Sequence, residues 1–149
     1  MNDTEDISKF TPLYYAVMGN HQAVMKKLLE SGADPNPVDY AGTTPLRQAV
    51  VYYKRDVARL LIDNGARADH VQTQGCGGGL SEFGWAIEYG QHDLAKYMIE
   101  KGAINLREPS NAFQSLYGRS EADIPVAQLL LEKENSGCEA LLRDNKEKV

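Results

Sequence analysis

Cysteine, tryptophan and basic residues are scarce in this chain of 149 residues. It has two cysteines and one tryptophan, and 16 lysines and arginines stand against 21 aspartates and glutamates, giving a formal charge of −5. Two cysteines provide neither a disulfide framework nor the spacing of zinc ligands. An acidic chain lacks the basic density that nucleic-acid binding requires. A basic protein partner therefore fits better than nucleic acid.

Long hydrophobic runs are also missing. The first ten residues, MNDTEDISKF, are polar and acidic, so we expect neither a secretory signal nor a membrane-spanning helix. We accordingly expect a cytoplasmic protein that does not contact a membrane. With 42% hydrophobic and 25% charged residues, the composition is typical of one folded domain rather than of a disordered tail.

A short motif occurs twice, as TPLYYAV at residues 11–17 and as TPLRQAV at residues 44–50. In each copy the threonine can cap a helix by accepting a hydrogen bond from a free main-chain N–H. The proline that follows has a helical φ and no N–H to leave unpaired. The motif therefore predicts a helix start at Thr11-Pro12 and another at Thr44-Pro45.

Further landmarks repeat at the same interval as the motif. Ala16 and Ala49 are 33 residues apart, and so are Gly32 and Gly65. Between them lie AVMKKLLESGA and DVARLLIDNGA, whose apolar residues have helical spacing and whose glycines suit a left-handed helix end. The pattern predicts a unit of helix, turn, helix and loop.

A period of 33 residues with Thr-Pro-Leu-x-x-Ala is typical of ankyrin repeats, and this chain resembles that family. The stretch from Asp39 to Asp69 is similar to one whole repeat. Two features depart from the family pattern. Tyr14 and Arg47 replace the histidine that usually follows the leucine, and Tyr53 replaces the glycine between the two helices. The hydrogen-bonding role of that histidine is thus not expected here.

A third copy begins at Ser81-Glu82-Phe83, with its landmarks displaced by 37 residues, and the excess falls in the loop QTQGCGGGL. A fourth, degenerate unit includes a second helix that starts near Pro125. The resemblance implies an all-α ankyrin-repeat solenoid of about four helix-turn-helix units with a degenerate C-terminal cap. The expected segments are an extension at 1–9, units at 10–38, 39–71, 72–106 and 107–135, and a cap helix at 136–149.

No set of residues supports catalysis, a cofactor or a metal ion. The glycine-rich loop at 74–79 lacks the Gly-Lys-Ser/Thr of a phosphate-binding loop. The three histidines fall on different units, whereas a metal site needs three or four convergent donors. Cys76 has no histidine or acid placed beside it by the repeat register, so an inert thiol is the better interpretation.

The resemblance implies that partners bind the concave face and the loop tips. Aromatic side chains there would offer large contact area and few rotamers, although some rings could instead pack between units. We expect the only tryptophan to point outward and its truncation to cost little stability. The candidate partner-binding residues are Tyr15, Met18, Tyr40, Gln48, Tyr52, Cys76, Trp85, Glu88 and Tyr89.

The resulting hypothesis is a non-enzymatic module, monomeric when free, that binds and inhibits or neutralises a protein, as an antitoxin or immunity protein does. One alternative is an adaptor or regulatory subunit of a complex. Another is a small-ligand binder that uses the glycine-rich loop at 74–79 as a lid.

Overall fold

The computed structural model describes residues 10–71, 80–105 and 121–133. Residues 10–71 and 80–105 form pairs of short helices connected by loops. Val71 and Ser81 form an isolated antiparallel bridge. The elements are α1 (Pro12–Met18), α2 (Gln22–Glu30), α3 (Pro45–Val51), α4 (Arg55–Asp63), α5 (Glu82–Glu88), α6 (His92–Glu100), the 3₁₀ turn η1 (Glu121–Asp123) and helical residues 124–133.

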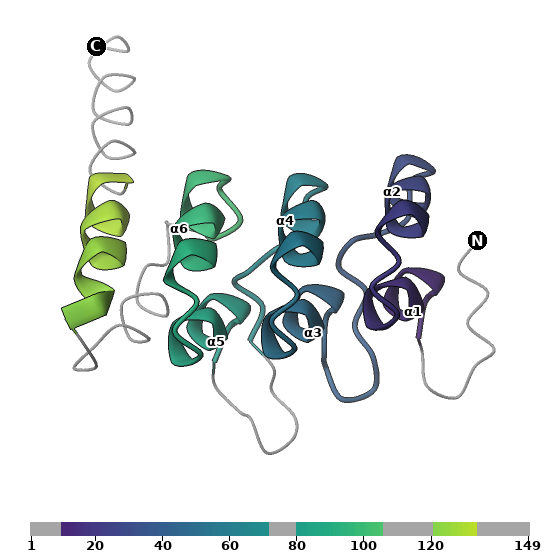
Figure 1. The fold of residues 1–149 in the computed structure, drawn as a ribbon, viewed down its shortest axis with the longest axis horizontal. Coiled ribbons are helices and arrows are strands. Elements are labelled where there is room, and N and C mark those ends of the chain that lie inside the picture. Colours follow the sequence, from purple (N-terminus) through teal and green to yellow (C-terminus); the bar gives the residue numbers. More distant parts are fainter. Residues whose placement is uncertain (1–9, 72–79, 106–120, 134–149) are drawn as a thin grey trace, which may run out of the picture.

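The helices are arranged in two parallel rows (Figure 1). One row holds the first helix of each unit, α1, α3 and α5, and the other holds the second helices, α2, α4 and α6. The loop between α2 and α3 extends beyond the first-helix row (Figure 1). Each helix from α1 to α6 contacts its partner within the unit. Between units, α3 contacts α1 and α5, and α4 contacts α6. This is the architecture of a solenoid, in which each unit is stabilised by its neighbours.

The predicted helix starts are confirmed. The Thr11 hydroxyl accepts a hydrogen bond from Tyr14 N at 3.3 Å, and the Thr44 hydroxyl accepts one from Arg47 N at 3.1 Å. Ser81 caps α5 in the same way, at 3.2 Å from Gly84 N. Each cap satisfies a donor at the helix N-terminus that has no partner within the helix.

The predicted helix ends and turns are confirmed as well. Gly32 and Gly65, which follow the second helices, have φ values of 89° and 93°. Between the helices of a unit, the left-handed position is occupied by Asn20, Tyr53 and Gly90. Tyr53 is unusual, because a bulky residue rarely adopts φ near the observed 56°.

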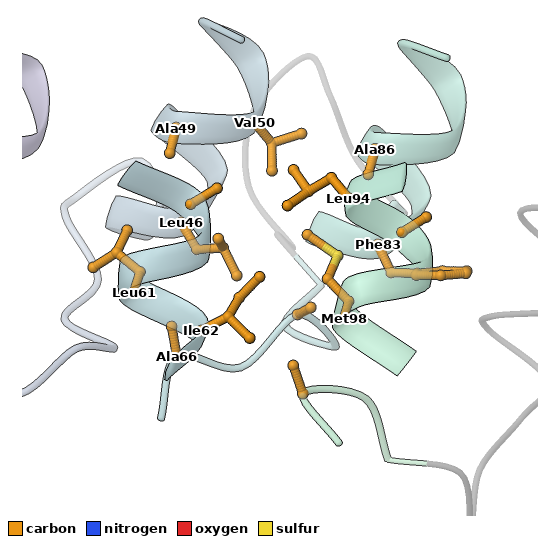
Figure 2. Packing of buried hydrophobic residues seen from close by; sticks show 14 of the residues in the cluster. Leu46, Ala49, Val50, Leu61, Ile62, Ala66, Phe83, Ala86, Leu94 and Met98 are labelled. Atoms are coloured by element: carbon orange, nitrogen blue, oxygen red, sulfur yellow. The ribbon is translucent and has the colours of Figure 1, made fainter. Parts of the chain in front are cut away.

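The core runs continuously between the two rows. Figure 2 shows Val50 of α3 and Leu94 of α6 facing each other between neighbouring units, with Ile62 and Met98 close below. Phe83 of α5 is completely buried. Because each unit supplies the surface that covers the one before it, burial of this apolar area is the main favourable contribution to the stability of the whole stack.

Main-chain carbonyls of one unit also receive side-chain hydrogen bonds from the next. Lys54 Nζ donates to Val17 O at 2.9 Å and to Met18 O at 2.6 Å. In the next unit, Gln91 Nε2 donates to Val50 O at 2.7 Å. Val17 and Val50 are equivalent in the repeat, so the same tie recurs with a different donor. These bonds satisfy carbonyls at the C-terminal ends of α1 and α3.

The fourth unit is described only in part. Helical residues 124–133 include Pro125 in the first turn, as expected, and Leu130 is buried against the core. His92 Nε2 and Asp123 Oδ1, 2.7 Å apart, link α6 to η1. The first part of this predicted unit, at 107–120, and the predicted cap helix at 136–149 lie outside the described residues.

Candidate functional site

Three side chains occupy equivalent outward positions on the first helices, one residue before the packed alanine of each unit. Tyr15 on α1 is 52% exposed. Gln48 on α3 and Trp85 on α5 are half-buried. The register therefore brings these three predicted residues to one side of the molecule, with more solvent access in the first unit than in the second and third.

The ends of the first helices add more aromatic and apolar surface. Met18 is 52% exposed, and Tyr52 and Tyr53 are 63% and 56% exposed. Tyr53 contacts Tyr89 with ring centroids 5.6 Å apart, and Tyr89 stacks on Trp85 at 5.5 Å. The rings thus form a continuous chain across the second and third units. We call the set Tyr15, Met18, Tyr52, Tyr53, Trp85 and Tyr89 the aromatic face.

Trp85 differs from the expectation of a freely projecting ring. It is half-buried and packed against the core, and its indole Nε1 is buried without a hydrogen-bond partner among the described residues. The guanidinium of Arg47 lies over the ring, 5.0 Å from its centroid. The periodicity of one helix does not show how closely the neighbouring unit approaches. A side chain that points outward from α5 therefore still contacts α3.

Two buried charges underlie this part of the surface. Arg47 is 6% exposed and Glu82 is 0% exposed. Thr44 donates its hydroxyl hydrogen to Glu82 Oε1 at 2.7 Å, whereas Glu82 Oε2 and Arg47 Nη1 have no hydrogen-bond partner among the described residues. Burial raises the pKa of Glu82, although Thr44 and the charges of His70 and Arg47 favour its ionised form. Burial likewise lowers the pKa of Arg47.

Part-buried hydrogen bonds, without buried charged side chains, join the first and second units. Gln48 donates through Nε2 to the hydroxyl of Tyr14. Burial, together with the negative charge of Asp39, raises the pKa of Tyr14 to about 12. Asp39 itself accepts hydrogen bonds from Ala41 N at 2.9 Å and Thr43 N at 2.8 Å. These contacts hold the loop before α3 against the exposed side of the first helices.

The remaining predicted residues are spread around this face. Tyr40, 59% exposed, lies on the loop between α2 and α3, and Glu88 is exposed at the end of α5. Cys76 lies outside the described residues. Tyr40 therefore lies in a turn of the loop that precedes α3.

Sequence reasoning missed Tyr53 and the burial of Arg47. A tyrosine where glycine suits the turn was the available signal for Tyr53, because a bulky residue is strained there unless its ring makes contacts. Arg47 gave no such signal, since arginine is mostly exposed in proteins. Only the approach of α5 to α3 buries it.

Other kinds of site find little support. Within the described ranges, no three histidine, cysteine, aspartate or glutamate side chains group as metal ligands would. No helix in those ranges has the length and apolar character to cross a bilayer. A hollow of about 490 Å³ lies between the loop before α3 and the loop after α4. Two of the residues that line it, Arg67 and Asp69, form an ion pair with each other, and the side chain of Asn36 accepts a hydrogen bond from Arg67 N.

Comparison with known families decides the classification of this fold. A family model described as ankyrin repeats, in three copies, matches residues 1–74. The match covers the two complete units with the Thr-Pro-Leu motif. The chain belongs to the ankyrin repeat family.

Individual relatives agree with this ankyrin assignment. The chain is 39% identical over 64 residues to human neurogenic locus notch homolog protein 4, covering 43% of this chain and 3% of that protein. It is 39% identical over 54 residues to mouse protein phosphatase 1 regulatory subunit 12A, covering 36% of this chain and 5% of that protein. This ankyrin chain thus spans only a small part of the length of either relative.

A solved ankyrin structure confirms the architecture. The ankyrin repeat domain of Bcl-3, described as a unique member of the IkappaB protein family, matches with a TM-score of 0.66 and 27% identity. The likeness covers 80% of this chain and 51% of that one. The predicted all-α ankyrin solenoid is therefore confirmed. Ankyrin repeats are protein–protein interaction modules, so the expected functional site is a surface that binds another protein.

Proposed function

We propose that this ankyrin chain is a non-enzymatic module that binds a protein partner through the aromatic face and the neighbouring loop tips, and that binding inhibits or neutralises the partner. The carrying observation is the continuous chain of rings from Tyr53 through Tyr89 to Trp85, flanked by the exposed Tyr52. Tyrosine and tryptophan are enriched at the centres of protein interfaces, because they bury large area with few rotamers.

The choice of this side over the second-helix row also rests on its chemistry. The second-helix row carries mixed charges that pair with one another, such as Lys101 Nζ and Asp63 Oδ1 at 3.6 Å. Tyr97 there donates its hydroxyl hydrogen to Asp63 at 2.6 Å. Surface pairs of this kind contribute little to association and are typical of a solvated face. The aromatic face instead has three rings that are more than half exposed, those of Tyr15, Tyr52 and Tyr53.

An inhibitory role, of the kind seen in antitoxins and immunity proteins, is favoured by a small acidic surface that could cover a basic active site. The matched protein phosphatase 1 regulatory subunit 12A is by its name a regulatory subunit, which supports the alternative of an adaptor or subunit in a complex. Both roles need the same face. They differ in whether the partner loses its own activity on binding.

The test uses a double variant, Tyr52→Ser with Tyr53→Asn. Asparagine is chosen because Asn20 adopts the same left-handed conformation in the first unit. Immobilised wild type and double variant are incubated with lysate of the source cell. We expect a protein that is retained by the wild type and by Tyr97→Ala, a control in the second-helix row, but not by the double variant. Equal retention on all three proteins would contradict the proposed face.

Inhibition is then measured separately. The retained protein is purified and its own activity is assayed with increasing amounts of the ankyrin chain. Loss of activity at a one-to-one ratio supports a blocker, whereas unchanged activity in a stable complex supports the adaptor.

A further inference from the structure

The cations on the binding side of the molecule are all engaged within the chain. This side comprises the first helices, the turns that follow them and the loops that precede them, at residues 10–21, 34–54, 64–71 and 80–91. Its described residues carry five carboxylates and three cations. The carboxylates are Asp34, Asp39, Asp69, Glu82 and Glu88, and the cations are Arg47, Lys54 and Arg67.

Each of the three cations has an internal role. Lys54 Nζ donates to two main-chain carbonyls, at 2.6 and 2.9 Å, and lies 5.9 Å from the centroid of the Tyr52 ring. Arg67 forms an ion pair with Asp69. Arg47 is buried, with its guanidinium over the ring of Trp85. A partner approaching this side therefore meets no cation that is both exposed and unengaged among the described residues.

Two of the carboxylates, unlike the cations, interact mainly with main-chain N–H groups. Asp34 and Asp39 accept hydrogen bonds from main-chain N–H groups, Asp34 from Asn36 N at 2.9 Å. Neither forms an ion pair among the described residues. The charges of Asp34 and Asp39 thus have no ion-pair partner among the described residues. Glu88 is a further carboxylate, at the exposed end of α5.

The exposed tyrosine rings also favour a partner that carries positive charge. The face of an aromatic ring carries partial negative charge and attracts lysine or arginine within about 6 Å. The chain already uses this attraction, since Arg47 lies over Trp85 and Lys54 lies near Tyr52. Tyr52 and Tyr53 remain more than half exposed, so they have ring surface available for cations supplied by another molecule.

We propose that the partner segment seated on the aromatic face is cationic, with lysine or arginine side chains packed on Tyr52 and Tyr53 and attracted by the carboxylates of the loops. This inference rests on the proposed function and adds the chemistry of the partner. An acidic segment would meet an uncompensated negative surface, and a purely apolar one would leave those carboxylates without a counter-charge.

The experiment selects binders from a displayed library of random peptides on the wild-type chain at low ionic strength. Enriched peptides are then titrated against four proteins: the wild type, the double variant Tyr52→Ser/Tyr53→Asn, the ring-preserving variant Tyr52→Phe/Tyr53→Phe, and Tyr97→Ala. We expect the enriched peptides to carry a net positive charge. Their affinity should fall about tenfold or more in the double variant, as loss of two cation–ring contacts would give.

The two control variants and salt sharpen the outcome. Tyr52→Phe/Tyr53→Phe and Tyr97→Ala should bind like the wild type, and raising the salt concentration from about 0.05 to 0.5 M should weaken binding through screening. Enriched peptides that require the two tyrosines but are neutral or acidic would overturn the cationic partner and leave the proposed function standing. Absence of enrichment, or binding that ignores the two tyrosines, would overturn both.

Discussion

The contact between the first and second units and the contact between the second and third units are built on the same register but hold different chemistry. The first uses part-buried polar groups with partners, such as Gln48 with Tyr14 and Lys54 with Val17 O. The second places Arg47 and Glu82 in the interior. A repeat architecture therefore fixes where the contacts lie without fixing their polarity.

Unpartnered atoms make the difference concrete. The buried polar side-chain atoms without a hydrogen-bond partner in the described ranges are Arg47 Nη1, Glu82 Oε2, Trp85 Nε1 and Gln91 Oε1. All four side chains lie at the contact between the second and third units. Such atoms cost stability. Yet this contact also buries Phe83 and supports half of the aromatic face, so apolar packing must offset the cost.

The largest expected effect tests that apolar packing. Phe83→Ala should lower the free energy of unfolding by about 3–5 kcal/mol, because it empties a fully enclosed site. Leu13→Ala, at the equivalent position of the first unit, should cost about 2–3 kcal/mol, since removal of the smaller leucine side chain leaves a smaller cavity. Urea unfolding of both variants measures the difference. A greater loss for Leu13→Ala would reverse the ranking of the two contacts.

A second prediction concerns equivalent outward positions. Trp85→Ala should cost about 2 kcal/mol, roughly half the loss for a fully buried ring, whereas Tyr15→Ala should change stability by less than about 0.5 kcal/mol. Trp85 is the single tryptophan, so the emission of the native protein reports its surroundings. Emission typical of a fully solvated indole, with no loss of stability in Trp85→Ala, would instead support the expectation that the ring projects freely into solvent.

A third prediction compares the two side chains that tie neighbouring units. Gln91→Ala should cost about 1–2 kcal/mol, because it removes a fully buried hydrogen bond to the Val50 carbonyl, which would keep only its bond from Tyr53 N. Lys54→Ala should cost about 1 kcal/mol or less, since Lys54 is only half-buried and water can replace its ammonium group. Thermal unfolding at one pH and salt concentration compares them. Equal losses would mean that burial does not distinguish the two ties.

The smallest change is expected from Glu82→Gln, which keeps an oxygen that can accept the hydrogen bond from Thr44. The folded pKa of Glu82 is raised by burial, so the folded state retains a proton that the unfolded chain loses above the ordinary glutamate pKa of about 4.3. The wild type therefore loses stability relative to the variant as pH rises from there through the folded pKa. A stability difference that is independent of pH would contradict this reasoning.

Much of the fold was predictable from local signals. Thr11 and Thr44 cap helices, and Gly32 and Gly65 end them, because these residues have conformational and hydrogen-bonding preferences that act within a few positions. The same holds for Pro125, which lies in the first turn of helical residues 124–133. The 33-residue interval then fixes which helices stack, so the solenoid itself followed from the sequence.

The sequence by itself also determined that the first helices present Tyr15, Gln48 and Trp85 on one side, since helical periodicity and the repeat register require it. The tertiary structure alone decided how open each position is. Contact of α5 with α3 covers Trp85 with Arg47 and encloses Glu82, and it brings Tyr53 to Tyr89. The reason is physical: burial and charge pairing depend on the distance between residues about 35 positions apart in the chain, and a local pattern carries no information about that distance.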